Sequence, residues 1–193
     1  MDVLEAIRTR RTAGKIRPDL PPRELIEEVL EAATWAPNHR LNEPWRFIVL
    51  AGEAREQFGR VMAADACQGL DDPASDKAQG IVEAQMKKAT RSPVVIAVAC
   101  DPATDPKIDP VEDVAAVSCA IQNLMLAGHA RGLTTKWSSG KPCYSPALKA
   151  FFGLTPEHQI LGYIYLGYPD ESPKQTARTP HAQKTTWLGW PPA

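Results

Sequence analysis

Apolar residues recur along this chain in two rhythms, and each rhythm predicts one kind of secondary structure. Helical spacing follows a cap at Asp2 and returns over about 22–35, where Pro37 disfavours helical geometry at the residue before it. The same spacing predicts further helices over about 53–64, from a cap at Asp76, over about 111–130 and over about 146–152. Apolar runs predict buried strands at 47–50, 94–99 and 160–166, and a short strand is expected at 133–136.

The order of these segments indicates the fold class. Two helices precede the first strand, two more precede the second, and the later strands are separated by single helices. Strict strand–helix–strand alternation, which a Rossmann fold requires, is absent. We therefore expect an α+β fold, with one central mixed or antiparallel sheet and helices around it. The 193 residues contain no internal repeat or composition boundary, so 1–193 is expected to form a single domain.

Two segments are more apolar than expected for segments exposed to solvent in a single chain. The helix expected over 111–130 carries apolar residues on one face and much alanine opposite, which predicts burial nearly all round. It is either the central core helix or part of a subunit interface. The segment after Tyr168 is rich in proline and contains Trp187 and Trp190. Such a segment is too apolar for a free end, so we expect it to pack on another surface.

Composition and charge narrow the function classes. The formal net charge is −1, so no global field attracts nucleic acid or an anionic membrane, and any attraction for phosphate must be local. The four cysteines form no C-x-x-C pair, and Cys100 and Cys119 lie in apolar stretches where buried free thiols are expected. With no apolar signal region and no run long enough to span a bilayer, a cytoplasmic location is expected.

The first candidate site is Arg10-Arg11-Thr12, at the end of the opening helix. A guanidinium group matches phosphate oxygens bidentately, and a short hydroxyl beside it can hold a neighbouring oxygen. The alternative is a solvated helix end whose charges suit the helix dipole. Interleaved aromatic residues are absent, which argues against a nucleic-acid patch. The usual nucleotide-binding motifs are also absent, because no G-x-G-x-x-G follows a strand and Gly140-Lys141 lacks the rest of a phosphate loop.

Two further segments lie beside predicted strands. Ala36-Pro37-Asn38-His39 is a polar bend, closed by Pro44-Trp45, that leads into the first strand. Loops of this kind at the mouth of a scaffold often bind ligands, although Asn38 can equally close a turn while His39 lies on the surface. Trp137-Ser138-Ser139-Gly140 follows the third strand, and its small residues would let a backbone N–H approach a ligand ring. A plain turn is the alternative.

Together these segments resemble the nitroreductase family of flavoproteins, in particular its short, compact bacterial members. The strand end from Tyr163 to Pro169 adds to the likeness, which covers nearly the whole chain. The resemblance implies an α-β-α sandwich that forms a homodimer, with two FMN molecules at the subunit interface and the tail from about 169–193 packed on the partner. It also implies transfer of two electrons from NADH or NADPH to nitroaromatics, quinones or other small-molecule acceptors by a ping-pong mechanism.

The resemblance assigns roles to the first segment. Arg10 would bind the FMN phosphate, and Arg11 and Thr12 would hold phosphate and ribityl oxygens. Thr12 stands where serine is more usual, which preserves the hydroxyl. A basic residue near the C-terminus often assists with the phosphate in this family, and the sequence leaves Arg178 and Lys184 as alternatives.

The other two segments receive roles in the same way. Trp35 and His39 would reach the pocket from the other subunit, while Trp137, Ser138 and Ser139 would lie along the isoalloxazine with a backbone N–H near its N5. No catalytic side chain is implied, because the flavin carries the redox step. Two departures concern specificity: Ser138 replaces a larger, often basic residue, and Glu43 replaces an amide.

Two other functions remain open from the sequence. One is a flavin-binding storage or sensing protein without nicotinamide turnover. The other is a flavin oxidase or dehydrogenase that acts on a specific metabolite.

Overall fold

The structure is a computed structural model that describes residues 1–172 and 176–191. It contains four strands: β1 (Trp45–Ala51), β2 (Val94–Cys100), β3 (Thr134–Ser138) and β4 (Gln159–Gly167). The helices are α1 (Val3–Thr9), α2 (Arg23–Thr34), α3 (Glu53–Ala66), α4 (Asp76–Ala89), α5 (Pro110–Ala130) and α6 (Pro146–Phe151), with short 3-10 turns η1 (His39–Leu41), η2 (Lys141–Tyr144) and η3 (His181–Lys184).

The four strands form one antiparallel sheet in the order β1-β2-β4-β3. The apolar strands β2 and β4 occupy its centre, as their continuous hydrophobic runs predict, and all seven residues of β2 are buried. β1 and β3 form the edges. The site segments adjoin these edge strands, because β3 ends at Ser138 and β1 follows directly on the bend that contains His39.

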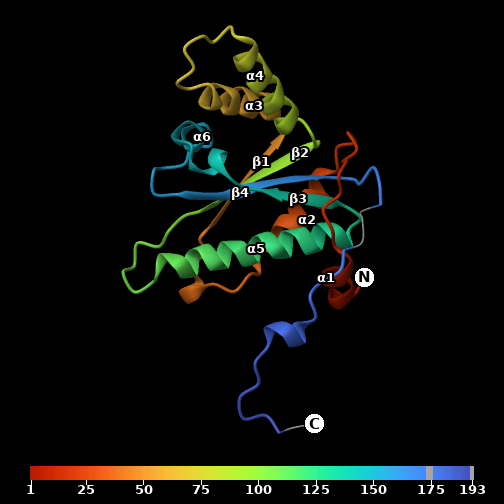
Figure 1. The fold of residues 1–193 in the computed structure, drawn as a ribbon. Helices are drawn as coiled ribbons and strands as arrows, with labels where there is room; N and C mark the ends of the chain where they lie inside the picture. Colours follow the sequence, from red (N-terminus) through yellow and green to blue (C-terminus); the bar gives the residue numbers. More distant parts are fainter. Residues whose placement is uncertain (173–175, 192–193) are drawn as a thin grey trace.

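Helices cover both faces of the sheet, so the chain is an α+β sandwich as expected (Figure 1). α2 and α5 pack on one face through a core that includes Val29, Ile121 and Leu124. α3, α4 and α6 cover the other face, where Phe58 packs against Tyr163 at a ring distance of 5.0 Å.

The predicted elements are present, with differences at particular residues. Asp2 caps α1 as expected, but α4 is capped by the Ser75 hydroxyl, and Asp76 is the first residue of that helix. The third strand runs on to Ser138, so Trp137 and Ser138 belong to β3 and not to the turn after it. Cys100 is buried as expected, whereas Cys119 is exposed. Hydrophobic neighbours in the sequence did not indicate which side of a helix Cys119 would occupy.

α5 is therefore not buried all round in the single chain. Its inner side holds Val117, Ile121 and Leu124, while an outer stripe is exposed at Val111, Ala115, Cys119 and Gln122. α1 packs beside the C-terminal half of α5 and also leaves apolar side chains open, with Leu4 at 57% and Ile7 at 52% exposure. The surface built by α1 and α5 is thus unusually apolar for a free surface.

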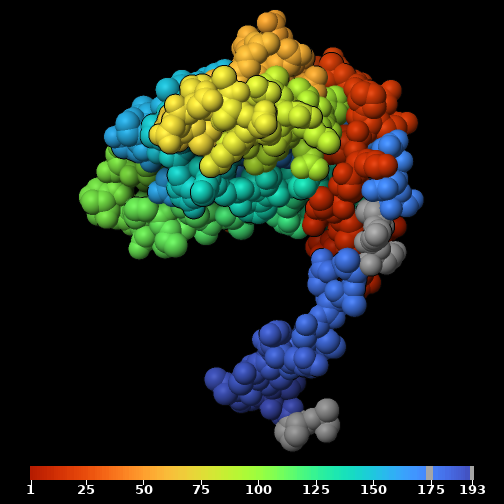
Figure 2. Space-filling view, turned by 45° about the horizontal axis from the view of Figure 1, so that its top comes forward, coloured from red at the N-terminus to blue at the C-terminus, as the bar shows by residue number. Residues whose placement is uncertain are grey.

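The described part of the C-terminal tail leaves the body and extends away from it (Figure 2). Residues 176–191 are exposed, and Trp187 and Trp190 contact each other at a ring distance of 5.5 Å while remaining 63% and 72% exposed. Within the single chain, these rings are not covered by the sandwich. Among the described residues, no helix combines the length and the apolar character needed to cross a membrane.

Candidate functional site

Arginine side chains from both ends of the chain gather around one hollow. α1 ends at Thr9, and the chain then passes Arg10 and Arg11 into an extended segment. A hollow of about 490 Å³ lies there, lined by Ile7, Arg8, Arg10, Arg11, Gln122 and Arg178. Burial together with the charges of Arg11 and Arg178 lowers the pKa of Arg10. Like charges this close repel one another, so the hollow is suited to an anion with several oxygens.

Arg11 and Thr12 occupy different positions within this segment. Nη1 of Arg11 donates to the carbonyls of Arg8 and Arg10 at 2.7 and 2.8 Å, which satisfies the end of α1. Its Nε is buried and has no hydrogen-bond partner within the described residues. Thr12 is exposed. Arg11 therefore binds the carbonyls at the end of α1 and also keeps a buried N–H that no described residue accepts.

The arginine segment is fixed to the rest of the fold by two hydrogen bonds. The buried backbone N–H of Ala13 donates to the hydroxyl of Thr134, the first residue of β3, at 3.2 Å. Oγ1 of Thr9 lies 2.8 Å from Nε2 of His129, near the end of α5. Burial and the charges of Arg10 and Arg11 lower the pKa of His129, although Glu5 acts in the opposite direction. These contacts hold the hollow at the junction of α1, α5 and β3.

β3 leads from this junction to the third predicted segment. Trp137 donates its indole N–H to the carbonyl of Leu161 at 3.0 Å and lies over Gly162, where a Cβ atom would come within 2.2 Å of the indole nitrogen. Trp137 is thus a fixed wall at the end of the strand. Ser138 is half-buried and Ser139 is exposed. About 13 Å of strand separates Thr134 from Ser138, so a ligand held at the arginine hollow could extend along β3 towards the serines.

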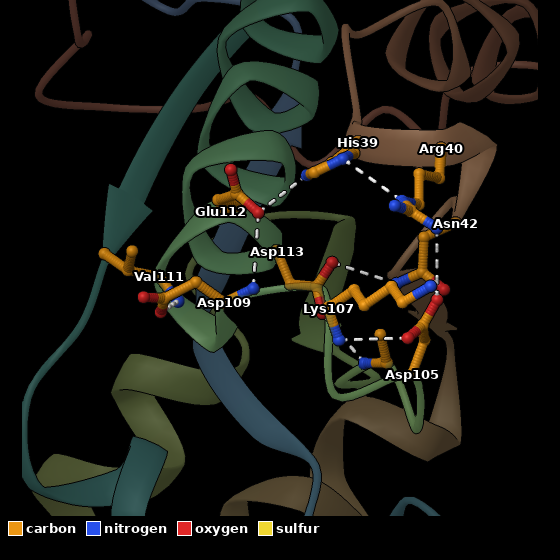
Figure 3. Close-up of polar contacts among 10 residues, drawn as sticks. His39, Arg40, Asn42, Asp105, Lys107, Asp109, Val111, Glu112 and Asp113 are labelled. Carbon is orange, nitrogen blue, oxygen red and sulfur yellow. Dashed lines mark hydrogen bonds and ion pairs between the residues drawn. The ribbon is translucent and has the colours of Figure 1, made fainter.

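The remaining predicted residues, Trp35 and His39, lie at the opposite end of α5. Trp35 follows α2 and is 80% exposed. It lines a second hollow of about 580 Å³ together with Leu41 and Glu43, among others. Nδ1 of His39 lies 2.7 Å from Oε2 of Glu112, in the first turn of α5 (Figure 3). Glu43, one of the departures from the family pattern, therefore lies on the rim of this second hollow.

The loop that carries His39 has an unusual backbone. Three of its residues that are not glycine, Arg40, Leu41 and Glu43, have φ angles of 53°, 55° and 48°. Such conformations are costly and persist where the surroundings fix them. The side chain of Asn42, which belongs to the same loop, donates a hydrogen bond to the buried carboxylate of Asp113 at 2.9 Å (Figure 3). The loop is therefore held in place by the start of α5.

The predicted residues thus form two groups on one chain. Arg10, Arg11 and Thr12 share a junction with β3, while Trp35 and His39 lie elsewhere. Thr9, next to the arginines, contacts His129 near the end of α5, and His39 contacts Glu112 in the first turn of the same helix. These two positions on α5 are about 25 Å apart along the helix axis. One chain therefore does not bring all the predicted residues together around a single ligand.

Several residues of the site lay outside the sequence prediction. Arg8 precedes the predicted segment, and Gln122 lies within the helix that was expected to be buried nearly all round. Glu112 was not singled out at all. Of the two basic residues considered for the tail, Arg178 lines the arginine hollow and Lys184 lies further along in η3. A signal for Arg8 existed in the density of arginines at 8–11, but the contact of Glu112 with His39 and the choice of Arg178 over Lys184 become recognisable only through folding.

Comparisons with known proteins show the family to which this fold belongs. The model of the nitroreductase family matches residues 7–168. The chain is 33% identical over 170 residues to "Putative NAD(P)H nitroreductase YdjA" of Escherichia coli (strain K12), which covers 88% of this chain and 89% of the relative. A crystal structure of a nitroreductase-like family protein from Bacillus cereus superposes with a TM-score of 0.84 at 29% identity, covering 98% of this chain and 97% of the other.

A second solved structure contains a cofactor. It is described as a "putative nitroreductase in complex with fmn" from Desulfovibrio desulfuricans, and it superposes with a TM-score of 0.74 at 25% identity over 99% of each chain. The fold, the family match over most of the chain and the similarity to YdjA lead to one conclusion. This chain belongs to the nitroreductase family.

Proposed function

We propose that this protein is an FMN-dependent oxidoreductase that uses NADH or NADPH to reduce nitroaromatic, quinone or similar small-molecule acceptors by a ping-pong mechanism. The observation that carries the proposal is the hollow in which Arg8, Arg10, Arg11 and Arg178 converge beside the start of β3. The relative YdjA is named for NAD(P)H and the similar structure from Desulfovibrio desulfuricans contains FMN, and these two similarities support the proposed electron donor and cofactor. We also propose that the protein acts in the cytoplasm, where NADH and NADPH are available as electron donors.

The residues present fit the cofactor at its phosphate end. Four guanidinium groups supply more positive charge than the described part of the hollow balances, and the unpartnered Nε of Arg11 is a buried donor. Arg10 and Arg178 would hold the phosphate, with Arg11 and the exposed Thr12 towards the ribityl chain. Trp137, Ser138 and Ser139 would border the ring, with backbone N–H groups near N5.

Catalysis then needs little acid–base chemistry from the protein. Bound FMN would supply two-electron transfer between the nicotinamide and the acceptor. The chain's own part is to bind the phosphate, to orient the ring along β3 and to offer N–H dipoles where negative charge develops. One face of the ring would remain open for donor and acceptor in turn.

We further propose a homodimer in which each site is shared between two chains. Trp35 and His39 lie at one end of α5, and the arginine hollow lies at the other. Two copies of α5 packed antiparallel about a two-fold axis would bring the His39 end of one chain to the arginine hollow of its partner. The geometry thus supports a role for Trp35 and His39 in trans.

The exposed apolar surface supports the same assembly. The stripe from Val111 to Gln122 is made mostly of small or apolar residues, and Gln122 also lines the arginine hollow. Small residues allow close helix packing, and the apolar side chains of α1 extend the surface. We propose that this surface forms the subunit interface and that the tail of about 169–193 packs on the partner, covering Trp187 and Trp190. Residues 173–175 and 192–193 of that tail lie outside the described residues.

The experiment that tests the function is anaerobic rapid mixing of the FMN-loaded protein. NADH or NADPH should bleach the flavin absorbance, and menadione or a nitroaromatic should restore it within the turnover time. Steady-state rates should give parallel double-reciprocal lines. Binding of FMN without reduction by either nucleotide would support a storage or sensing protein instead. Slow reduction by both nucleotides, together with fast reduction by another metabolite, would support the oxidase or dehydrogenase.

A further inference from the structure

The ring of His39 lies between two side chains of opposite charge. Its Nδ1 is 2.7 Å from Oε2 of Glu112, and its Nε2 is 3.4 Å from Nε of Arg40 (Figure 3). Glu112 comes from α5 and Arg40 from η1, so the two contacts arise from different elements. The ring is 39% exposed, so it remains open to a further partner.

The chemistry of these neighbours determines where the imidazole carries its proton. An ionised carboxylate only accepts hydrogen bonds, so Nδ1 must donate to Glu112. A guanidinium only donates, so Nε2 must hold a lone pair towards Arg40. One form of the ring satisfies both contacts, namely the neutral tautomer that is protonated at Nδ1. A ring protonated at both nitrogens would direct an N–H at the Arg40 donor.

We propose that Glu112 is a positioning residue that holds His39 in the Nδ1–H form, so that Nε2 meets the cofactor as a hydrogen-bond acceptor. The inference rests on the proposed function, and it specifies that Nε2 of His39 contacts the cofactor and that this atom accepts the hydrogen bond. An acceptor nitrogen requires a donor, so His39 would meet a ribityl hydroxyl or the ring imide N–H of FMN in the shared site. Phosphate oxygens and ring carbonyls are excluded as its partners. The 3.4 Å contact with Arg40 is long, so a better-placed donor can replace it.

The carboxylate is itself held in place. Oε2 of Glu112 also accepts the backbone N–H of Asp109 at 3.2 Å, which completes the capping box of α5. Hydrogen bonding from His39 and from this N–H lowers the pKa of Glu112, so the carboxylate is ionised at neutral pH. On the other side of the ring, Arg40 pairs with Asp105 at 3.5 Å. The charged groups that face His39 are therefore Glu112 and Arg40, with Asp105 and Asp109 behind them.

The readout is the tautomer of His39, measured by long-range proton–nitrogen correlation in protein labelled with ¹⁵N-histidine. The chain has four histidines, and His39→Gln assigns the signal. We expect the Nδ1–H pattern for wild type above pH 7, with or without FMN. Glu112→Gln retains an acceptor oxygen and should preserve this pattern. Glu112→Ala should lose it, giving the Nε2–H form or an exchanging mixture.

A matched control separates positioning from helix capping. Asp109→Ala removes the side-chain cap at Val111, 2.9 Å away, but leaves the backbone N–H that binds Glu112. This variant should keep the His39 tautomer and bind FMN within about twofold of wild type. Glu112→Ala should weaken FMN binding roughly fivefold, the loss expected for one neutral hydrogen bond.

Three results would overturn the inference. They are an Nε2–H form of His39 in the wild type, an unchanged tautomer in Glu112→Ala, and equal loss of FMN affinity in Glu112→Ala and Asp109→Ala. Failure of the proposed function is a different result, since the wild-type protein would then bind no FMN whatever its tautomer.

Discussion

The backbone N–H of Ala13 donates to the hydroxyl of Thr134 across 121 positions of the sequence, at a distance of 3.2 Å. The bond fastens the arginine segment after α1 to the first residue of β3, and both residues are buried. It therefore joins the part of the chain that would hold the phosphate to the strand that would border the ring.

Thr134→Val should reduce both stability and FMN affinity. The substitution keeps the shape of the side chain but leaves a buried N–H without a partner, which costs about 1–3 kcal/mol. Thr134→Ser keeps the hydroxyl and is the matched control. Urea unfolding of apo and FMN-loaded protein measures both effects. Equal stability of the valine and serine variants would show that the bond contributes nothing.

Arg10→Ala should yield protein that purifies largely without flavin. Loss of a charge-assisted hydrogen bond costs about 1.5–3 kcal/mol, which corresponds to a roughly 10- to 150-fold weaker Kd. Arg178→Ala should show a smaller loss, because its contact comes from the extended tail. Lys184→Ala is the control and should bind FMN like wild type. Fluorescence titration with FMN measures all three, and full occupancy of Arg10→Ala at low FMN concentration would contradict the phosphate role.

Cys119 offers a test of the interface because it is exposed in the single chain and lies in the α5 stripe. In the proposed dimer it is covered, so a thiol reagent should label it slowly in native protein and fast after dissociation in mild denaturant. Burial raises the pKa of Cys100 to about 11, so Cys100 should stay unreactive until global unfolding. Cys119→Ser identifies the signal. Rapid stoichiometric labelling of native protein at micromolar concentration would contradict the interface.

The pKa of His129 predicts how stability depends on pH. Burial is the largest cause and lowers the pKa below its ordinary value of 6.5, so near and below that pH the unfolded chain binds more protons than the folded one. Stability should therefore fall as the pH drops below 6.5. His129→Gln removes the titration and should flatten this part of the profile. Unfolding free energies of both proteins between pH 5.5 and 7.5 check the prediction, and parallel profiles would refute it.

Secondary structure was predictable where periodicity and burial agree. β2 is an unbroken apolar run at the centre of the sheet, and α2 has apolar residues at regular helical spacing, so both lie where the pattern predicts them. The end of β3 was not predictable, because Thr134 to Ser138 is not an apolar run, and Trp137 and Ser138 belong to the strand only through their pairing with β4. Strand pairing overrides local composition there.

The site was predictable only where its residues are neighbours in sequence. Arg10, Arg11 and Thr12 are adjacent, so their chemistry is visible in the sequence. Arg178 reaches the same hollow from the far end of the chain, and Glu112 meets His39 through a loop with an unusual backbone. Such juxtapositions depend on tertiary structure, which a single sequence does not reveal. The exposed face of α5 is a further case, since composition indicated burial without indicating what covers it.

A hybrid dimer tests the shared site most directly. Arg10→Ala and His39→Ala chains, each with a different affinity tag, are co-expressed, and the doubly tagged dimer is isolated and titrated with FMN. In a shared site, the hybrid regains one unaltered site from the intact Arg10 of one chain and the intact His39 of the other. We predict that one site per hybrid dimer, half a flavin per chain, binds FMN with wild-type affinity, whereas every site of either parent dimer binds FMN more weakly. A hybrid that binds no better than its parents would contradict the account.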